Sequence, residues 1–208
     1  YNTPLEQFKA LEAVSIVHGK AECVDVAANA VTVLRVDGET ESISYDYLVI
    51  ASGTSNGFWR TDRVQSSSEI STELSNQAER IQTASSVTVV GGGPSGVSVA
   101  LNIKRKDPAK QVTLCLSAAL PLPGYHPDAR RFYQNALTEA GVDIVYEDRV
   151  ATIDESQLSG TLTLSSGTTL SSDAIIWTIG RRKPHTAFLP DHLLDEEHFV
   201  KAKPTLEV

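Results

Sequence analysis

Apolar and polar residues alternate along the chain with two periods, and each period predicts a different kind of element. Near the N-terminus, apolar residues at helical spacing predict a short helix over residues 2–13, and residues 14–17 form an apolar stretch typical of a strand. A continuous apolar run over residues 45–54 ends in small residues and predicts a buried parallel strand. Between these runs, three alternating stretches with a turn at Asp37-Gly38 predict an antiparallel meander: residues 20–26, 30–36 and 41–44.

The second part of the chain is organised around a glycine-rich stretch. Residues 61–86 carry a helical stripe and lead into a short buried strand at 87–90, and a helix follows the glycines until Asp107-Pro108. We expect the βαβαβ unit built on this strand to be parallel with right-handed crossovers. The predicted features are a stripe of Ile70, Leu74, Ala78 and Ile81, strands at 111–116 and 142–146, a helix at 128–140 with Phe132, Ala136 and Ala140 on one stripe, Tyr133 and Leu137 beside it and a stop at Gly141, meander strands at 150–153, 161–164 and 168–170, and a buried strand at 173–180.

Two of these apolar runs match each other. Residues 46–53 align with residues 173–180 without a gap, and each run begins with Asp and ends with Gly. Each run also follows a predicted meander, so the pattern indicates that the chain carries one unit twice. Only the second copy has an opening strand, a glycine turn and a helix. We therefore expect the native protein to continue upstream of Tyr1 and to hold another dinucleotide site there.

The glycine turn itself carries the strongest chemical signal. Gly91, Gly93 and Gly96 have the spacing G-x-G-x-x-G between a strand and a helix, and Pro94 suits the first helical turn. In such a turn the first glycine permits the bend, the second lets a pyrophosphate approach the backbone, and the third lets the helix pack on the strand. The alternative is that the glycine-rich turn only connects a strand to a helix. Because the G-x-G-x-x-G spacing occurs with a strand directly before it and a helix directly after it, nucleotide binding is favoured over this alternative.

Composition narrows the classes of function. The 208-residue chain has a formal net charge of −8, which disfavours a nucleic-acid surface, and no apolar run is as long as a membrane span. The polar N-terminus is unlike a signal peptide, and Cys23 and Cys115 are interpreted as buried structural thiols of a cytoplasmic or other reducing compartment. No catalytic or metal-binding constellation is evident, and the five histidines are interpreted as scattered surface residues: His18, His126, His185, His192 and His198.

The order of these motifs resembles one known family over nearly the whole chain. Residues 45–53 are similar to the Y-D-x-L-V-I-A-T-G strand of FAD-dependent pyridine-nucleotide oxidoreductases, and residues 89–97 resemble the G-G-G-P-T-G-V-E turn of their NAD(H) domain. Residues 173–184 resemble the second strand and G-R-x-P turn, and residues 199–206 resemble the segment before the final FAD-contacting G-D motif. Within the family, the turn is most similar to type II NADH dehydrogenases and apoptosis-inducing-factor-like quinone reductases.

The resemblance implies an α/β, Rossmann-like FAD/NAD(P)-binding fold with a parallel sheet, helices on one face, a three-stranded antiparallel meander and two related lobes, the first incomplete. Residues 56–180 would form the NAD(P)H-binding domain, and residues 1–55 and 181–208 parts of the FAD domain. Hydride would pass from NAD(H) or NADP(H) to FAD and on to a quinone or similar small acceptor. FAD is expected in the full-length protein and not in this chain, and any membrane association would come through parts outside it. The candidate cofactor-binding residues are Gly91, Gly92, Gly93, Pro94, Ser95, Gly96, Ser98, Leu116, Ser117, Ile179, Gly180, Ser52 and Gly53.

Two departures from the family pattern keep alternatives open. Ser98 stands where the family usually has a glutamate near the nicotinamide, which favours a nucleotide-sensing module with little turnover over an efficient enzyme. Ser117 stands where an acid would bind the ribose 2′-hydroxyl of NAD, so the residues fit either NADH or NADPH. A disulfide reductase is a third alternative, although the predicted nicotinamide domain lacks a C-x-x-C motif.

Overall fold

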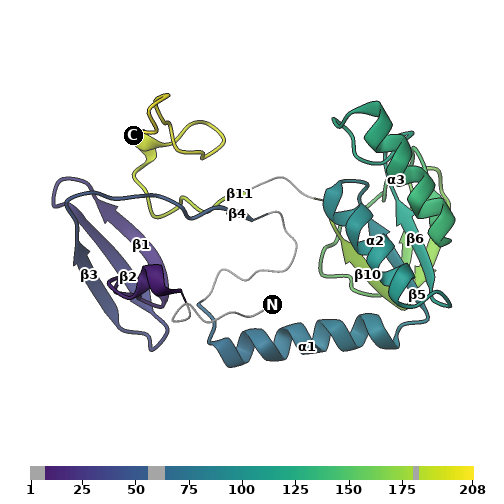
Figure 1. Ribbon diagram of the computed structural model, residues 1–208, viewed down its shortest axis with the longest axis horizontal. Helices are drawn as coiled ribbons and strands as arrows, with labels where there is room; N and C mark the ends of the chain where they lie inside the picture. Colours follow the sequence, from purple (N-terminus) through teal and green to yellow (C-terminus); the bar gives the residue numbers. More distant parts are fainter. Residues whose placement is uncertain (1–7, 56–63, 180–182) are drawn as a thin grey trace. The chain divides into compact units, whose positions relative to one another are not determined.

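The computed structural model describes residues 8–55, 64–179 and 183–208, and Figure 1 shows the elements that they form. The chain divides into two compact units, each built from segments distant in sequence. Unit 1 comprises Tyr1–Gly53, Thr61–Ser66 and Pro184–Val208, whereas unit 2 comprises Thr54–Arg60 and Ser67–Lys183. The assignment of these units to FAD and NAD(P)H domains remains a prediction.

Unit 1 contains the predicted first meander, which the structure confirms. Its antiparallel strands run in the order β1-β2-β3, with bounds Gly19–Asp25, Ala30–Arg35 and Thr40–Ser44. A register shift between Ala21 and Cys23 changes which side chains of β1 face inward. Val24 is therefore buried, while Cys23 is exposed. The interpretation of Cys23 as a buried thiol was wrong, because the bulge interrupts the simple alternation of the strand.

The C-terminal segment packs on this meander. Val24, Leu189 and Leu194 form a buried cluster, and the N–H of Val24 donates to the Phe188 carbonyl at 2.8 Å. A short 3-10 helix, η3 (Asp191–Leu193), lies within the segment, and an isolated bridge pairs Leu194 with Val200. Residues 2–7 of the predicted N-terminal helix lie outside the described residues, and within residues 8–13 the structure has only the 3-10 turn η2 (Lys9–Leu11).

Two predicted strands of the first half are not formed. Residues 14–18 have no regular secondary structure, and within residues 45–55 only β4 (Thr54–Ser55) is a strand, paired with β11 (Lys183–Pro184). Tyr47 and Val49 are 93% and 86% exposed, although Tyr45 and Ile50 pack against the unit 1 cluster. A strand needs a neighbour for its backbone N–H and C=O groups, and no strand in the described part of the chain pairs with residues 46–53.

Unit 2 contains the predicted parallel sheet. The strand order is β10-β5-β6-β7, so β5 lies inside the sheet, between β10 and β6. All three pairings are parallel, with Val90 of β5 level with Trp177 of β10 and Cys115 of β6. The bounds are β5 (Ser86–Val90), β6 (Gln111–Cys115), β7 (Asp143–Val145) and β10 (Ala174–Trp177).

Two helices cover one face of this sheet, as expected. Figure 1 shows α2 (Pro94–Lys106) and α3 (Pro127–Ala140) beside each other against the strands. Val97, Ala100 and Leu101 of α2 join Leu137 of α3 in the main buried cluster. The predicted stripe on α3 was wrong at Phe132, which is 65% exposed and makes an edge-to-face contact with Tyr133.

A β-hairpin packs against the opposite face of the sheet. The hairpin strands are β8 (Gly160–Thr163) and β9 (Thr169–Ser172), and Leu162 packs with Val90, Ile175 and Trp177. The predicted first strand of the second meander, at 150–153, was wrong, because within it only Val150 pairs, in an isolated bridge with Leu164. Asp154 turns the chain shortly afterwards: its carbonyl accepts from the N–H of Gln157 at 3.0 Å.

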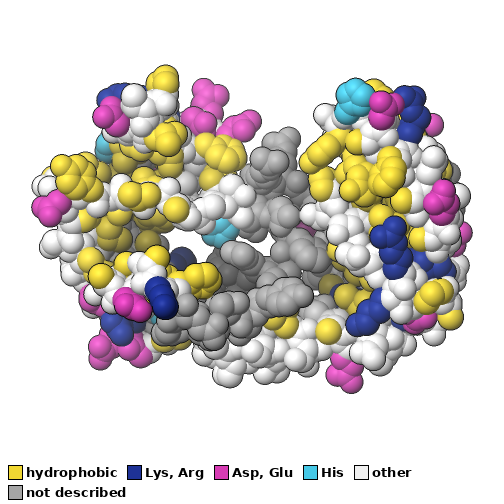
Figure 2. Space-filling view, in the orientation of Figure 1, with side chains coloured by type: hydrophobic (Ala, Val, Ile, Leu, Met, Phe, Trp, Pro, Cys, Tyr) yellow, Lys and Arg dark blue, Asp and Glu magenta, His cyan; other side chains and the backbone are white. Residues whose placement is uncertain are grey.

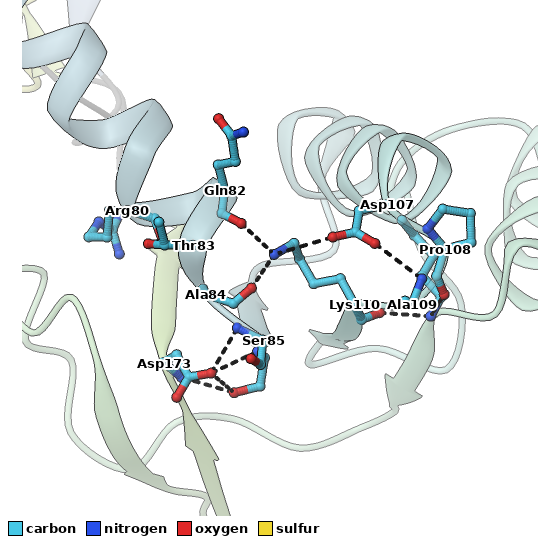
Figure 3. Close-up of polar contacts among 12 residues, drawn as sticks. Arg80, Gln82, Thr83, Ala84, Ser85, Asp107, Pro108, Ala109, Lys110 and Asp173 are labelled. Carbon is cyan, nitrogen blue, oxygen red and sulfur yellow. Dashed lines mark hydrogen bonds and ion pairs between the residues drawn. The ribbon is translucent and has the colours of Figure 1, made fainter.

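Side chains at the N-terminal ends of the strands connect the predicted helix α1 (Ser67–Thr83) to the sheet (Figure 3). Lys110 is only 6% exposed; its ammonium donates to the carbonyls of Gln82 and Ala84 and lies 3.6 Å from the Asp107 carboxylate. The Asp173 carboxylate accepts from the backbone N–H groups of Ser85 and Ser86, each at 2.9 Å. These contacts lie at the N-terminal ends of the strands, whereas the glycine turn lies at the C-terminal end of β5. They therefore stabilise unit 2 without occupying its candidate site.

Candidate functional site

The candidate site begins where β5 ends at the glycine turn. Gly91 has φ of +122°, a conformation that L side chains rarely adopt. A Cβ built at this position would lie 2.6 Å from Thr178 Oγ1 and 2.9 Å from Ile179 Cγ2. The turn therefore requires glycine here for two reasons: the positive φ is unfavourable for other residues, and a side chain would collide with the residues that follow β10.

Gly96 holds α2 close to the turn. A Cβ on Gly96 would collide with the backbone carbonyl oxygen of Gly91 and lie 2.7 Å from Thr178 Oγ1. Gly92 is similarly close to Leu116 at the end of β6, with 2.7 Å between a built Cβ and the Leu116 Cβ. Three of the predicted site residues therefore pack against neighbouring strands, and they fix the direction in which α2 leaves the sheet.

Gly93 differs from these three because it borders open space. No heavy atom lies within 4 Å of a Cβ built on Gly93, and its φ of −76° and ψ of 180° suit any residue. It is the N-cap of α2, and Pro94 follows inside the helix. Packing therefore does not require glycine at this position, whereas close approach of a ligand to the backbone would.

The first turn of α2 presents unpaired donors beside Gly93. The first backbone hydrogen bond into the helix runs from Val97 N–H to the Gly93 carbonyl at 3.0 Å. The N–H groups of Ser95 and Gly96 precede that bond and donate to no backbone carbonyl in the described part of the chain. Pro94 has no N–H and the N–H of Val97 is used within the helix, so only part of the first turn can donate to a ligand. The positive end of the helix dipole adds to the attraction of these donors for an anion.

The end of β6 and the loop after it form a second side of the site. Leu116 is buried and donates its N–H to the Val145 carbonyl at 2.9 Å, while Ser117 is exposed. The loop then returns to the turn, where the Leu122 N–H donates to the Gly92 carbonyl at 2.7 Å. Arg130 of α3 holds the same loop through the carbonyls of Leu120 and Pro121, at 3.1 and 3.0 Å. Figure 2 shows hydrophobic side chains exposed around the N-terminal half of α3.

Thr178 was not predicted as a site residue, although it connects the end of β10 to the turn. Its N–H donates to the Val90 carbonyl at 2.9 Å, and its hydroxyl lies 2.8 Å from that carbonyl and 3.2 Å from the Gly91 carbonyl. Ile179 follows it beside the turn, and Gly180 lies outside the described residues. A hydroxyl residue ending an apolar strand was the available sequence signal.

The other predicted site residues lie further along α2 and in unit 1. Ser98 is exposed on α2, and its hydroxyl accepts from the Asn102 side-chain amide at 3.3 Å. Ser52 and Gly53 are exposed residues of unit 1, and the Gly53 carbonyl accepts from the His185 N–H at 3.0 Å. His185 was wrongly interpreted as a surface residue: it is half-buried, and its Nε2 is buried with no hydrogen-bond partner among the described residues.

Charges near the end of β6 are negative. The Asp148 carboxylate accepts the Ser166 hydroxyl at 2.6 Å and the Arg149 N–H at 2.9 Å. The Ser166 hydroxyl, together with these backbone donors, lowers the pKa of Asp148, so the carboxylate stays ionised at neutral pH. Burial, with a smaller contribution from the Asp148 charge, raises the pKa of Cys115 to about 11, which keeps this thiol protonated and unreactive.

Neither a metal site nor a membrane-spanning helix occurs within the described residues. Over the ranges 8–55, 64–179 and 183–208, no group of three or more His, Cys, Asp or Glu side chains could hold a metal ion. None of the helices in those ranges has both the length and the apolar character needed to span a membrane.

Comparison with known proteins gives the geometry a context. The pattern of the pyridine nucleotide-disulphide oxidoreductase family matches residues 2–203. The oxidoreductase OXR1 of Ajellomyces capsulatus is 30% identical over 205 residues, which cover 93% of this chain and 44% of that protein. Ferroptosis suppressor protein 1 of Xenopus laevis is 33% identical over 132 residues, covering 62% of this chain and 35% of that protein.

Solved structures share the fold. The water-forming NADH oxidase of Lactobacillus brevis, bound to NADH, matches with a TM-score of 0.62 at 20% identity, over 81% of this chain and 38% of that one. The chain therefore spans less than half the length of these three proteins.

Proposed function

Because the chain belongs to the pyridine nucleotide-disulphide oxidoreductase family, we propose that unit 2 binds NADH or NADPH for transfer of hydride to a flavin. The family consists of oxidoreductases that act with nicotinamide and flavin cofactors. FAD, held by the full-length protein, would accept the hydride's two electrons from the reduced nicotinamide and pass them to a quinone or similar small acceptor.

The observation that carries the proposal is the open space at Gly93 beside the N–H groups of Ser95 and Gly96, which donate to no backbone carbonyl among the described residues. A pyrophosphate needs both features, since its oxygens accept hydrogen bonds and its bulk must approach the backbone closely. The other glycines of the turn are explained by packing alone. Gly93 is the position where the structure offers a reason for glycine only if a ligand is present.

The remaining residues would orient the dinucleotide around this point. Ser117, exposed after β6, offers a hydroxyl at the position from which the adenine ribose is bound in this fold. Ile179, at the end of β10, would provide an apolar wall on the other side of the turn. For FAD, unit 1 offers Ser52 and Gly53 as exposed residues, which is too small a contact surface to retain a flavin.

A nucleotide-sensing module with little turnover is the second candidate function. Its supporting observation is Ser98, which is exposed and uncharged, with its hydroxyl engaged by Asn102. A glutamate is usual here in the family that the sequence resembles. Reduction of the full-length flavoprotein by NADH, followed as bleaching of the flavin absorbance, separates the two candidates. Flavin bleaching on mixing with NADH indicates a reductase. Binding of NADH without flavin bleaching indicates a sensor.

The binding proposal is tested by calorimetric titration of the chain with NADH. We expect Gly93→Val to weaken binding at least about tenfold, because a branched side chain would occupy the space the pyrophosphate needs. Thr163→Val places the same side chain at an exposed position of β8 and should bind as the wild type does. Thermal unfolding of both variants checks that they are folded. Equal affinity of Gly93→Val and wild type would refute the proposal.

A further inference from the structure

The sequence lacks an acid at the end of β6, but the fold brings two acids to that place from another strand. The N–H of Glu147 lies 3.4 Å from the Ala118 carbonyl, and the N–H of Asp148 lies 3.3 Å from the Leu116 carbonyl. Both acids follow β7, which pairs with β6 in parallel. Residues 147 and 148 therefore flank Ser117 in space, about 30 positions further along the sequence.

We infer that Glu147 and Asp148 make the dinucleotide site selective for NADH over NADPH. This inference rests on the proposed function, since it concerns the same site. The adenine ribose 2′-position lies at the residue that ends the second strand of this fold, which here is the neighbourhood of Ser117. NADH carries a neutral hydroxyl at that position, whereas NADPH carries a phosphate with up to two negative charges. The negative charges of these two residues, whose backbones lie on either side of Ser117, would repel the phosphate much more than the neutral hydroxyl of NADH.

The two carboxylates differ in how they are held. Asp148 is fixed by the Ser166 hydroxyl and by backbone N–H groups, and its backbone carbonyl lies 3.8 Å from Cys115 Sγ at the end of β6. Glu147 is exposed and has φ of +53°, which is uncommon for a residue with a side chain. Asp148 therefore provides a fixed negative charge, and Glu147, whose backbone N–H faces the Ala118 carbonyl, is the second acidic residue of this segment.

Most basic side chains around this end of unit 2 have other partners. Arg130 donates to the Leu120 and Pro121 carbonyls, and Arg131 pairs with Asp128 at 2.8 Å. Arg149 directly follows the two acids in sequence, and its positive charge would oppose their effect. A guanidinium directed at Ser117 would bind the 2′-phosphate and favour NADPH instead.

The experiment measures the affinities of the chain for NADH and for NADPH separately by calorimetry. The wild type should bind NADH roughly tenfold more tightly, the order expected of a like-charge contact near a protein surface. Glu147→Gln combined with Asp148→Asn should bring the ratio close to one by strengthening NADPH binding, with NADH binding changed less than about twofold. Raising the NaCl concentration should also reduce the wild-type preference, because salt screens exposed charges. Glu139→Gln, which removes an exposed acid near the other end of α3, is the matched control and should leave the ratio unchanged.

The outcomes distinguish failure of the inference from failure of the proposed function. Equal wild-type affinities, or a ratio that the double variant does not change, would overturn the inference while leaving dinucleotide binding in place. Tighter binding of NADPH, lost specifically in Arg149→Gln, would overturn it in favour of a phosphate-binding arginine. Binding of neither dinucleotide would overturn the proposed function and this inference with it.

Discussion

Replacing Gly96 by alanine tests whether the close approach of α2 to β5 is structural. In an ordinary helix this change stabilises, because alanine has a helix propensity about 1 kcal/mol more favourable than glycine. Here the added methyl group would collide with the Gly91 carbonyl oxygen and lie 2.7 Å from Thr178 Oγ1. The obstacle is backbone, so α2 itself must shift, and overpacking of this kind costs roughly 1–3 kcal/mol or more. Because the collision is with backbone, we take the cost at the upper end of this range, about 3 kcal/mol, and expect a net loss of about 2 kcal/mol in the stability of unit 2.

The matched control is the same substitution at Gly93, three residues earlier. No atom lies within 4 Å of the new methyl group there, and φ of −76° is favourable for alanine. The reduced entropy of the unfolded chain stabilises by about 0.4–1 kcal/mol, and a poorer N-cap offsets a similar amount. Gly93→Ala should therefore change stability by less than about 0.5 kcal/mol.

Native-state hydrogen exchange of the amides in α2 and β5 measures unit 2 by itself, without assuming that both units unfold together. A loss of about 2 kcal/mol appears as roughly 30-fold faster exchange of the most protected amides. If Gly96→Ala exchanged as slowly as wild type or more slowly, helix propensity would outweigh the collision. The explanation of Gly96 by close packing would then be wrong.

Three further expectations follow from the described residues. At pH 8, iodoacetamide should label the exposed Cys23 in the native chain and Cys115 only after unfolding, since burial raises the pKa of Cys115 to about 11; peptide mass spectrometry showing equal native labelling would contradict this. The N–H and hydroxyl of Ser86, and the N–H of Ser85, lower the pKa of Asp173, so its contribution to stability is present above the unfolded pKa of about 3.9 and is lost as pH falls through the lower folded value. The melting-temperature difference between wild type and Asp173→Asn should therefore shrink from pH 7 to pH 3, and a constant difference would be inconsistent with an ionised role. The purified chain should show no flavin absorbance after gel filtration, and a persistent flavin band would mean that unit 1 holds FAD with fewer contacts than expected.

The sequence predicts unit 2 well because its elements carry strong local signals. The glycine turn, Pro94 and the apolar residues of β5 and β6 agree with one another, and Gly141 ends α3 with φ of +83°, as a C-terminal glycine should. The misses arise where a neighbour decides the outcome. The bulge in β1 exposes Cys23, and the pairing of β6 with β7 brings Glu147 and Asp148 to Ser117. Neither effect has a signature at the residue concerned.

The two matched apolar runs make the same point most directly. Residues 46–53 and 173–180 share their first and last residue types and their apolar interior. In the second run, Ala174–Trp177 is a buried strand, because β5 lies beside it and the β8–β9 hairpin packs on Ile175 and Trp177. In the first run, Tyr47 and Val49 are exposed and no described strand pairs with the backbone. An apolar run therefore gives a segment the capacity to be a buried strand, and the hydrogen bonds and side chains of a neighbour determine whether it becomes one.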